Sequence, residues 1–497
     1  MRLKQPSKQN IIPLILGSLC ALGNNPWALW YLSILSLILW FSIVIKNDIP
    51  KKIFKETFQF GFGYFAISLI WIVEPFFVEP WVHGWIAPIA LIALPSFLAL
   101  IWAIFAFLGH YYLSSIGIVI GLSLAEYCRL YLLTGFPWAT ISYILLDTKA
   151  EKWLSLLGPY GLSLFLLLTC FIIARTLQIR TKINTFSAIC TTSTLFFVPY
   201  FFEDTNQKNL NVSVRLIQPN AVQEKKWSEE FAPVFFEQMI EMTAQQPKPD
   251  VVIWPETSLY LPYNSAFDEL DRMRKAAEES ILIFGALQID PTNFLKNSLI
   301  IENKKQETVF YDKAKLVPFG EYLPFINLKS YFKISEQSNL FGGGFKKGEG
   351  SKLLNLPNGL KFVPLICYEA VFSNFLKPSV TNADFILQIT NDAWFGKSIG
   401  PQQHLAQLRI RAIEYGLPVI RVANTGISAI IDANGKVIDN LEINKSGYLD
   451  SFIPSRKDNT IYGLFGDLIF LSLVLFTMVI AFLIKKFISY RDIRIEN

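Results

Sequence analysis

Three side chains with complementary chemistry stand in the only long stretch of this chain that is not dominated by apolar runs. Glu256 ends the segment WPE, Lys313 ends the segment YDK, and Cys367 lies in the segment ICYE. A thiol attacks acyl carbonyl groups as a thiolate, so a free cysteine with a pKa of about 8.5 needs a base or a nearby cation. Glu256 is suited to take the thiol proton, and Lys313 to stabilise the thiolate and a tetrahedral oxyanion. The three residues predict a covalent active site.

Each of these residues has an ordinary structural explanation when it is taken alone. A glutamate at a strand end is usually a solvated rim residue, a lysine usually lies on the surface, and a cysteine after an apolar run is usually in the core. Cys367 is nevertheless the only cysteine in residues 203–462, since the other four lie in or beside apolar runs. It has no disulfide partner within that stretch, and a lone thiol there indicates reactivity.

The composition of the chain is that of a membrane protein. Of its 497 residues, 52% are hydrophobic and 17% are charged. Because a helix needs about 20 apolar residues to cross a bilayer, the apolar runs predict eight spans. These spans cover roughly residues 11–25, 28–46, 58–74, 85–108, 112–133, 160–177, 185–202 and 463–484.

Basic residues at the ends of these spans predict their topology. Clusters of Lys and Arg within 2–8, 46–55, 175–182 and 485–491 mark the cytoplasmic side of a membrane. With eight crossings, both termini are cytoplasmic and residues 203–462 lie on the outer face. The predicted domains are a transmembrane helical domain of about seven spans over 1–205, an outer catalytic domain over 206–458, and a transmembrane helix with a short cytoplasmic tail over 459–497.

Neither a nucleic acid nor a metal ion is an expected partner, and no cofactor is expected. The net charge of +5 is small, and the basic clusters lie at the ends of apolar runs. His83, His110 and His404 are scattered without the spacing of metal ligands. His404 is interpreted as a structural residue near the start of a helix rather than as a catalyst.

The outer stretch changes from continuous apolar runs to short β-rich segments that alternate with amphipathic ones, a pattern typical of an α/β domain. Helices are expected over 228–245, 265–279 and 401–415, and Asn434-Gly435 predicts a hairpin turn. The expected strands cover 212–216, 251–254, 281–287, 298–302, 361–367, 385–390, 418–422 and 427–431.

Longer motifs around the three residues carry a family resemblance. The segments WPE, YDKAKL and ICYE resemble the Glu-Lys-Cys signatures of the nitrilase, or carbon-nitrogen hydrolase, superfamily. Within it, LVPFGEYLP at 316–324 and NDAWFG at 391–396, together with the flanking membrane spans, resemble the apolipoprotein N-acyltransferase family. The resemblance covers essentially the whole chain.

The resemblance implies a fold and a reaction. The fold would be a multi-pass α-helical membrane domain plus an α/β outer domain, a nitrilase-like α-β-β-α sandwich. The enzyme would transfer a fatty acyl chain from a phospholipid donor to the α-amino group of the diacylglyceryl-modified N-terminal cysteine of an apolipoprotein, by a ping-pong mechanism through a cysteine thioester. Its place would be the bilayer of the bacterial inner membrane, with the catalytic domain on the periplasmic face.

The resemblance also implies a role for each matching residue. Glu256, Lys313 and Cys367 would be the base, the electrophile and the nucleophile, and Lys313 is preferred over Lys315 because the family lysine follows Tyr311 by two. The supporting residues would be Glu321, Tyr368 and Glu369. Aromatic residues expected to line the substrate site, for which plain packing is an equally good explanation, are Trp227, Phe319, Phe341 and Trp394.

Other interpretations compete with this one. A membrane-anchored nitrilase-type amidase would use the same three residues and pass the acyl group to water. A transporter or scaffold would show internal symmetry or broken helices, and the sequence shows neither. Glu126 and Arg129, three apart in a predicted span, indicate a pair that stabilises the helical bundle or serves a function there. The segment FGGGF at 341–345 predicts either a mobile lid or an ordinary turn.

Overall fold

The structure, a computed structural model, describes residues 11–46, 49–202, 208–303, 307–322, 324 and 344–496, with side chains as far as 486. The chain divides into two compact units. Unit 1 comprises Met1–Glu203 and Asp467–Asn497, and unit 2 comprises Asp204–Gly466. The predicted glycine segment at 341–345 falls largely outside the described residues, and so does Phe341.

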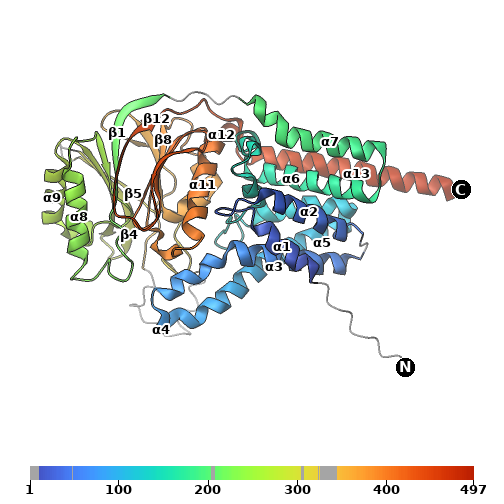
Figure 1. The fold of residues 1–497 in the computed structure, drawn as a ribbon, viewed down its shortest axis with the longest axis horizontal. Helices are drawn as coiled ribbons and strands as arrows, with labels where there is room; N and C mark the ends of the chain where they lie inside the picture. Colours follow the sequence, from blue (N-terminus) through green and yellow to red (C-terminus); the bar gives the residue numbers. More distant parts are fainter. Residues whose placement is uncertain are drawn as a thin grey trace. The chain divides into compact units, whose positions relative to one another are not determined.

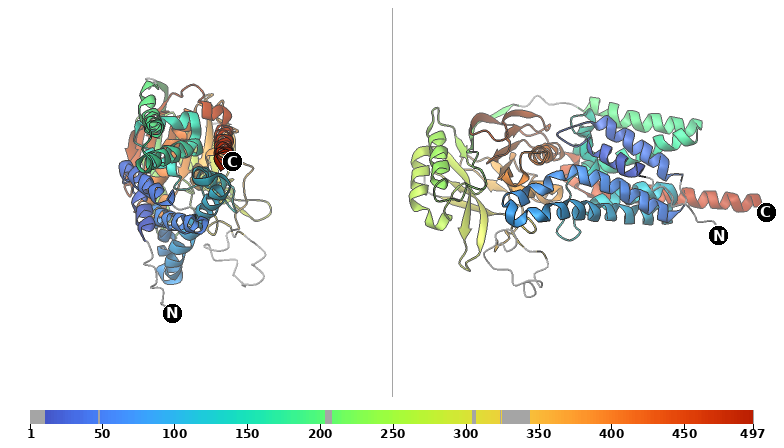
Figure 2. Two further views of the ribbon diagram at one scale, coloured as in Figure 1. Left: turned by 90° about the vertical axis from the view of Figure 1, so that its right-hand side faces the viewer. Right: turned by 60° about the horizontal axis from the view of Figure 1, so that its bottom comes forward.

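Unit 1 is built from helices alone in the part of the chain that the structure describes. Its α-helices are α1 (Ile12–Ala21), α2 (Trp30–Val44), α3 (Pro50–Ser68), α4 (Pro80–His83), α5 (Ala87–Cys128), α6 (Leu154–Gln178), α7 (Lys182–Phe197) and α13 (Leu468–Glu496). Short 3-10 helices join them, namely η1 (Ile70–Phe77), η2 (Gly84–Ile86), η3 (Ile141–Leu145), η4 (Lys149–Trp153) and η5 (Val198–Phe201). Figure 2 shows the long helices of this unit lying side by side.

The predicted spans fall largely on helices, and by helix length and composition three or four described segments are candidate crossings. Within the described residues, three segments are long and apolar enough to cross a membrane, at Pro80–Cys128, Lys149–Gln178 and Leu468–Lys486. A fourth is reached if the bent pair α3 and η1 forms one span. Helices α1 and α2 are apolar, but their 10 and 15 residues fall short of the about 20 that a crossing needs. Ser114 is non-helical inside α5, and a Cβ atom on Gly109 would lie 1.9 Å from the Gly117 carbonyl oxygen, so the two parts of α5 pack against each other as two helices. The prediction of eight spans stays a prediction.

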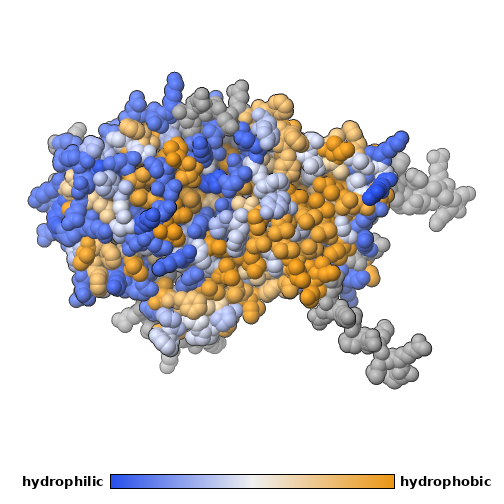
Figure 3. All heavy atoms as spheres, viewed as in Figure 1, coloured by the Kyte–Doolittle hydropathy of each residue, from blue (hydrophilic) through white to orange (hydrophobic). Residues whose placement is uncertain are grey.

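Small residues allow the helices of unit 1 to pack closely. A Cβ atom added at Gly17 of α1 would lie 1.9 Å from the Phe60 carbonyl oxygen of α3, and one at Gly63 would lie 2.2 Å from the Leu14 carbonyl oxygen. Such contacts are typical of helices packed in lipid. Apolar side chains also gather over the outside of this unit, as Figure 3 shows. With its long apolar helices, this surface identifies unit 1 as a membrane domain.

Unit 2 contains twelve strands in two sheets within its described residues. The strands are β1 (Asn209–Gln218), β2 (Val251–Ile253), β3 (Ile281–Ile289), β4 (Leu295–Glu302), β5 (Thr308–Asp312), β6 (Leu354–Asn355), β7 (Lys361–Ile366), β8 (Phe385–Thr390), β9 (Val419–Ala423), β10 (Ser428–Ile431), β11 (Val437–Leu441) and β12 (Gly447–Pro454). The helices are α8 (Ala232–Ala244), η6 (Tyr263–Ser265), α9 (Phe267–Ala277), η8 (Cys367–Val371), α10 (Ser373–Leu376), η9 (Asp392–Phe395), α11 (Gly400–Tyr415) and α12 (Ile461–Phe465).

The two sheets have matching architectures. Their strand orders are β12-β1-β2-β3-β4-β5 and β11-β10-β9-β8-β7-β6. In the first sheet β1, β2 and β3 are parallel, and in the second β7, β8 and β9 are parallel. The remaining pairs are antiparallel. Parallel strands are joined by helical connections that cover the sheets.

The helices of unit 2 cover the outer faces of the two sheets, giving four layers (Figure 1). Phe236 and Met239 of α8 pack with the buried side chains of β1, β2 and β3. Leu408 and Ala412 of α11 pack with those of β7, β8 and β9. Between the sheets lies a third apolar core that includes Phe362 and residues of both sheets. The predicted fold class, apolar helices plus a nitrilase-like α-β-β-α sandwich, is confirmed.

The strands missed by the hydrophobic pattern lie at the edges of the sheets. β5, β11 and β12 alternate buried and exposed residues or are largely exposed, so they carry no continuous apolar run. The hairpin predicted at Asn434-Gly435 does form between β10 and β11, and Gly435 has a φ of +80°. Edge strands have one neighbour only, so their sequences are less constrained by burial.

Candidate active site

The three residues predicted to be catalytic all follow strands. Glu256 lies just after β2, Lys313 directly after β5, and Cys367 directly after β7. In the first sheet β2 runs parallel to β3, and two antiparallel steps through β4 return β5 to the same direction. The carboxyl ends of β2 and β5 therefore lie at the same edge of the sheet, where Glu256 and Lys313 form an ion pair.

Glu256 is held at 5% exposure in a turn that a glycine makes possible. The Ser258 amide donates to the Gly285 carbonyl oxygen at 2.8 Å, and a Cβ atom on Gly285 would lie 2.6 Å from the Glu256 Cα. The carboxylate has further partners: Asn297 Nδ2 donates to Oε1 at 2.7 Å, and the Asn391 amide donates to Oε2 at 2.8 Å. Asn391 follows β8, so both sheets fix the orientation of this carboxylate.

Lys313 bridges two carboxylates. Its Nζ lies 3.2 Å from Glu256 Oε1 and 2.8 Å from Glu321 Oε1, and the side chain is 2% exposed. Glu321 is fixed in turn by the Val317 amide, which donates to Oε2 at 2.8 Å. Burial works against the charged form of Lys313, but the charges of Glu256 and Glu321 outweigh it and raise the lysine pKa well above its usual value. The ammonium group is therefore a permanent positive charge in the site.

Cys367 is 6% exposed and has a φ of +50°, in the left-handed region that few non-glycine residues adopt. Burial raises the pKa of its thiol well above the usual value, and the charge of Glu256 raises it further. Lys313 and a hydrogen bond with Thr390 act in the opposite direction. The resting thiol is thus protonated. If its proton passes to Glu256, the negative charge that opposes a thiolate disappears and the charge of Lys313 remains.

Glu369 fastens the segment that carries Lys313 to the segment that carries Cys367. Its Oε1 accepts from the Ala314 amide at 2.6 Å, and its Oε2 accepts from the Ile366 amide at 2.8 Å and from the Tyr311 hydroxyl at 2.9 Å. The side chain is fully buried, and burial raises the pKa of Glu369 to about 7. Its contacts are those of a residue that sets the spacing between two functional groups.

The aromatic residues expected in the substrate site differ in their surroundings. Tyr368, a predicted supporting residue beside the nucleophile, is 6% exposed and stacks edge-on against Phe372. Trp227, Phe319 and Trp394 are 45%, 55% and 37% exposed, so each presents a ring to the surface of unit 2. None of the three is simply a core residue.

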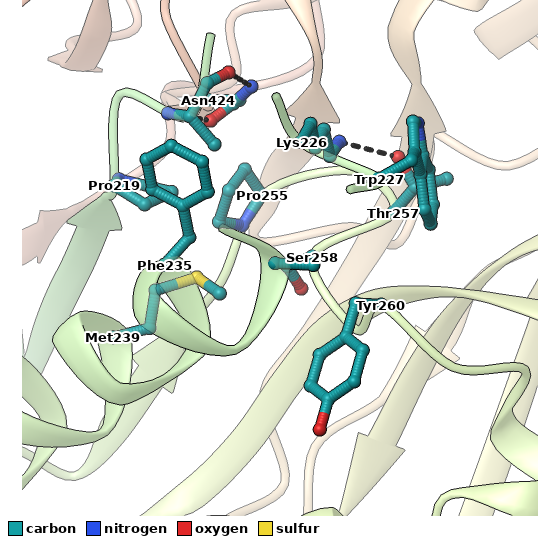
Figure 4. A pocket seen from close by; sticks show the side chains of 12 residues that line it. Pro219, Lys226, Trp227, Phe235, Met239, Pro255, Thr257, Ser258, Tyr260 and Asn424 are labelled. Carbon is teal, nitrogen blue, oxygen red and sulfur yellow. Dashed lines mark hydrogen bonds between the residues drawn. The ribbon is translucent and has the colours of Figure 1, made fainter. Parts of the chain in front are cut away.

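A pocket adjoins the turn of Glu256, lined by Pro255, Thr257 and Trp227 among others (Figure 4). Its space, part of it open to solvent, is about 300 Å³. Figure 4 shows Lys226 at its wall, and Lys226 Nζ donates to Thr257 Oγ1 at 2.8 Å and to the Glu256 carbonyl oxygen at 3.1 Å. Burial lowers the pKa of Lys226 to about 8, although the charges of Glu256 and Cys367 act against this.

Three contacting residues were not among those predicted from sequence. Asn297 and Asn391 hold the Glu256 carboxylate, and Lys226 holds the backbone of its turn. Asn391 is the first residue of the family motif NDAWFG, and Lys226 directly precedes Trp227, an expected site residue. The sequence therefore held a signal for both. Asn297 has no such signal, because its role depends on the pairing of β4 with β3 and β5. Within the described residues, no group of three or more His, Cys, Asp or Glu side chains has the arrangement of a metal site.

The fold and the site define a carbon-nitrogen hydrolase domain joined to a membrane domain, and comparison with known families agrees. Residues 213–454 match the carbon-nitrogen hydrolase family, and residues 16–172 match the apolipoprotein N-acyltransferase N-terminal domain. The apolipoprotein N-acyltransferase of Sinorhizobium fredii is 32% identical over 472 residues, which cover 90% of this chain and 88% of that protein. That of Rhizobium rhizogenes is 33% identical and covers 82% of both. The chain belongs to the apolipoprotein N-acyltransferase family and is an N-acyltransferase enzyme.

Solved structures show a more distant likeness. An amidase of the nitrilase superfamily from Nesterenkonia, solved as a cysteine-to-alanine mutant, is 14% identical with a TM-score of 0.38, and the match covers 50% of this chain and 92% of the amidase. A glutamine-dependent NAD+ synthetase from Acinetobacter baumannii is 18% identical with a TM-score of 0.36, covering 50% of this chain and 48% of the synthetase.

Proposed function

We propose that this enzyme transfers a fatty acyl chain from a phospholipid to the α-amino group of a diacylglyceryl-modified N-terminal cysteine, through a thioester on Cys367. The observation that supports this proposal most strongly is the buried cluster itself. A carboxylate and a permanent ammonium group both act electrostatically on one buried thiol. Membership of the family supplies the class of donor and acceptor, and the exposed rings of Trp227, Phe319 and Trp394 suit contact with lipid chains.

The first half of the reaction forms the thioester. Glu256 takes the proton of the Cys367 thiol as the sulfur attacks the ester carbonyl carbon of the phospholipid. Lys313 stabilises the tetrahedral oxyanion, a contribution of roughly 3 kcal/mol for a well-placed donor. The carbon–oxygen bond then breaks, Glu256 returns the proton to the leaving oxygen, and a lysophospholipid departs. Cys367 now carries the acyl chain.

The second half of the reaction transfers the chain. The lipoprotein amine attacks the thioester carbonyl carbon, and Glu256 accepts an amine proton. The carbon–sulfur bond breaks, the amide is released, and Glu256 returns the proton to the thiolate. The 6% exposure of Cys367 keeps most water away from the intermediate, which favours the amine over hydrolysis.

Intact-mass analysis after incubation with phospholipid vesicles tests this mechanism. The purified protein should gain the mass of one acyl chain, the adduct should be removed by hydroxylamine, and peptide mapping should place it on Cys367. Cys367→Ala should show no adduct. Cys190→Ala is the matched control, because Cys190 is an exposed free cysteine on α7 and its loss should leave the adduct intact.

Two outcomes would contradict the proposal. An adduct that persists in Cys367→Ala would place the nucleophile elsewhere. Release of free fatty acid without acylation of a diacylglyceryl-cysteine peptide would favour the amidase alternative, in which water accepts the acyl group.

We infer a periplasmic location for the site, with both termini cytoplasmic, in the bacterial inner membrane. The inference is supported by the Lys and Arg clusters at the ends of the apolar segments. A membrane-impermeant thiol reagent applied to intact spheroplasts should label a cysteine introduced at the exposed Lys275 of α9 and should not label one introduced at Lys486. The reverse labelling would overturn this topology.

A further inference from the structure

A buried polar network lies behind the backbone of Cys367. It consists of Gln388 on β8, Asp392 on η9, His404 on α11 and Arg421 on β9, and all four side chains are fully buried. Burying four polar groups is unfavourable unless each finds partners. The partners they share are one another and the main chain of Cys367.

The network contacts the strained residue itself. The Cys367 carbonyl oxygen accepts a hydrogen bond from Gln388 Nε2 at 2.9 Å, and His404 Nε2 lies 3.2 Å from the same oxygen. His404 Nε2 is also 3.1 Å from Gln388 Nε2. A non-glycine residue with a φ of +50° costs roughly 1–3 kcal/mol and persists only where its surroundings enforce it. Gln388 holds this carbonyl group by a hydrogen bond, and His404, whose Nδ1 faces Asp392, accepts from Gln388 at Nε2 and so holds Gln388 in place.

Asp392 and Arg421 fix the positions of these two side chains. Asp392 Oδ1 lies 2.9 Å from His404 Nδ1, and Arg421 donates both to Asp392 Oδ2 and to Gln388 Oε1. The imidazole is therefore oriented by a carboxylate at one nitrogen, with its other nitrogen directed at Gln388 and the Cys367 carbonyl group. The Gln388 amide has both ends occupied, so neither side chain is free to rotate.

The sulfur end of Cys367 belongs to the same network. The Thr390 side chain acts to lower the pKa of the Cys367 thiol, and Thr390 Oγ1 donates to Asp392 Oδ1 at 2.9 Å. Gly426 leaves room for Asp392, since a Cβ atom there would lie 2.4 Å from Asp392 Oδ2. Asp392 thus connects, through two short paths, to the carbonyl oxygen and to the sulfur of one residue.

We propose that His404 and Gln388, oriented by Asp392 and Arg421, are positioning residues that hold Cys367 in its strained backbone conformation and so direct its sulfur toward Glu256. This inference rests on the proposed role of Cys367 as the nucleophile and adds the residues that set its geometry. None of the four touches the reacting atoms. Their effect is on the rate of the chemical step rather than on substrate binding.

Substitutions of His404 test the proposal. His404→Asn keeps an amide at the Nδ1 position, beside Asp392, and removes the group at the Nε2 position. His404→Gln restores an amide near the Nε2 position. Tyr415→Phe is the matched control, because it removes one buried hydrogen bond of the same helix, to the Ser373 carbonyl oxygen, without contacting Cys367.

Positioning predicts a specific set of results. A misplacement of about 1 Å at a reacting group lowers a rate by roughly 10²-fold, so kcat of His404→Asn should fall by about that factor. Its KM should stay within about threefold, because ground-state binding is not altered. His404→Gln should recover about tenfold of the loss, and Tyr415→Phe should retain the wild-type kcat. Alkylation of Cys367 by iodoacetamide without phospholipid, followed by peptide mass spectrometry, should slow by about tenfold in His404→Asn alone, as its sulfur is displaced from Glu256.

Several outcomes would overturn the proposal. One is an unchanged rate of Cys367 alkylation in His404→Asn, and another is a loss of kcat no larger than that of Tyr415→Phe. A third is a loss of kcat that is proportional, across the variants, to the decrease in melting temperature. If His404→Asn does not fold, Gln388→Glu provides the same test, since it keeps an acceptor for Arg421 and removes the amide that donates to Cys367. If Cys367 is alkylated as fast in Glu256→Gln as in the wild type, that result would instead count against the proposed function.

Discussion

Two buried ion-pair clusters, one in each unit of this enzyme, differ in what they touch. In unit 1, Glu126 and Arg129 are 2.8 Å apart with both side chains fully buried. In unit 2, Lys313 lies between Glu256 and Glu321 with almost no exposure. By burial and distance alone, either pair would qualify as a functional site.

The partners of the unit 1 pair are all structural. Glu126 accepts from Trp102 Nε1 at 2.8 Å and from the Ile141 amide at 2.9 Å, while Arg129 donates to the Trp138 carbonyl oxygen at 3.0 Å. These bonds tie the end of α5 to the loop that follows it. We interpret this pair as a fastening of the helical bundle.

The unit 2 cluster differs because it has one more carboxylate than ammonium groups and because a nucleophilic thiol belongs to it. Lys313 faces two carboxylates, and its charge acts on the thiol of Cys367. A buried ion pair therefore serves stability or chemistry according to the reactivity of the third group beside it.

The largest effect is expected from Glu256→Gln. The amide is isosteric but cannot accept the thiol proton, so kcat should fall by roughly 10³-fold, within the range for loss of a general base. Glu126→Gln is the matched change in unit 1, and the fraction of it that folds should keep wild-type kcat. Steady-state acyl transfer, normalised to folded enzyme, measures both. Equal losses in the two variants would remove the distinction drawn here.

The free energy of unfolding, unlike kcat, should be strongly affected by the change in unit 1. Glu126→Gln leaves the buried Arg129 without a counter-charge and should lower the free energy of unfolding by about 3 kcal/mol. Replacing both residues, as Glu126→Gln with Arg129→Met, should recover much of this loss. Lys275→Ala, which breaks an exposed pair with Asp271, should change stability by less than about 0.5 kcal/mol. Denaturant titration in detergent gives the three values, and a stable Glu126→Gln single variant would contradict the structural interpretation.

A smaller effect than that of Glu126→Gln should come from Glu369, a buried carboxyl group without an ion-pair partner among the described residues. Burial raises its folded pKa to about 7, above the unfolded value of about 4.3. The folded state therefore holds the proton more tightly, and the stability that Glu369 contributes is present below about pH 4.3 and lost as the pH rises through 7. Between pH 5 and 8 the wild type should lose roughly 2.5 kcal/mol more than Glu369→Gln. Parallel pH profiles of the two proteins would show that Glu369 does not titrate in this range.

Much of the fold was accessible from the sequence because burial leaves a mark on composition. The buried strands β7, β8 and β9 read as apolar runs, and the segments that follow them contain Cys367, Asn391 and Asn424. The edge strands and the true lengths of α1 and α2 were not accessible, since an exposed strand or a short apolar helix carries no distinct pattern. The number of membrane crossings stays a prediction.

The three reactive groups, a carboxylate, an ammonium group and one thiol, could be recognised from the sequence alone near the ends of predicted strands. The residue types and motifs are local, so no structure is needed to see them. The other groups that orient them are visible only in the folded chain: Asn297 and Asn391 at Glu256, and Gln388 with His404 behind Cys367. Glu321, which the resemblance already implied as a supporting residue, contacts Lys313. These contacts join residues up to 135 positions apart, and they arise because two sheets place the ends of their strands at one site. Hydrogen bonds act over about 3 Å of space whatever the separation along the chain, so the packing of the sheets, rather than local sequence, sets them.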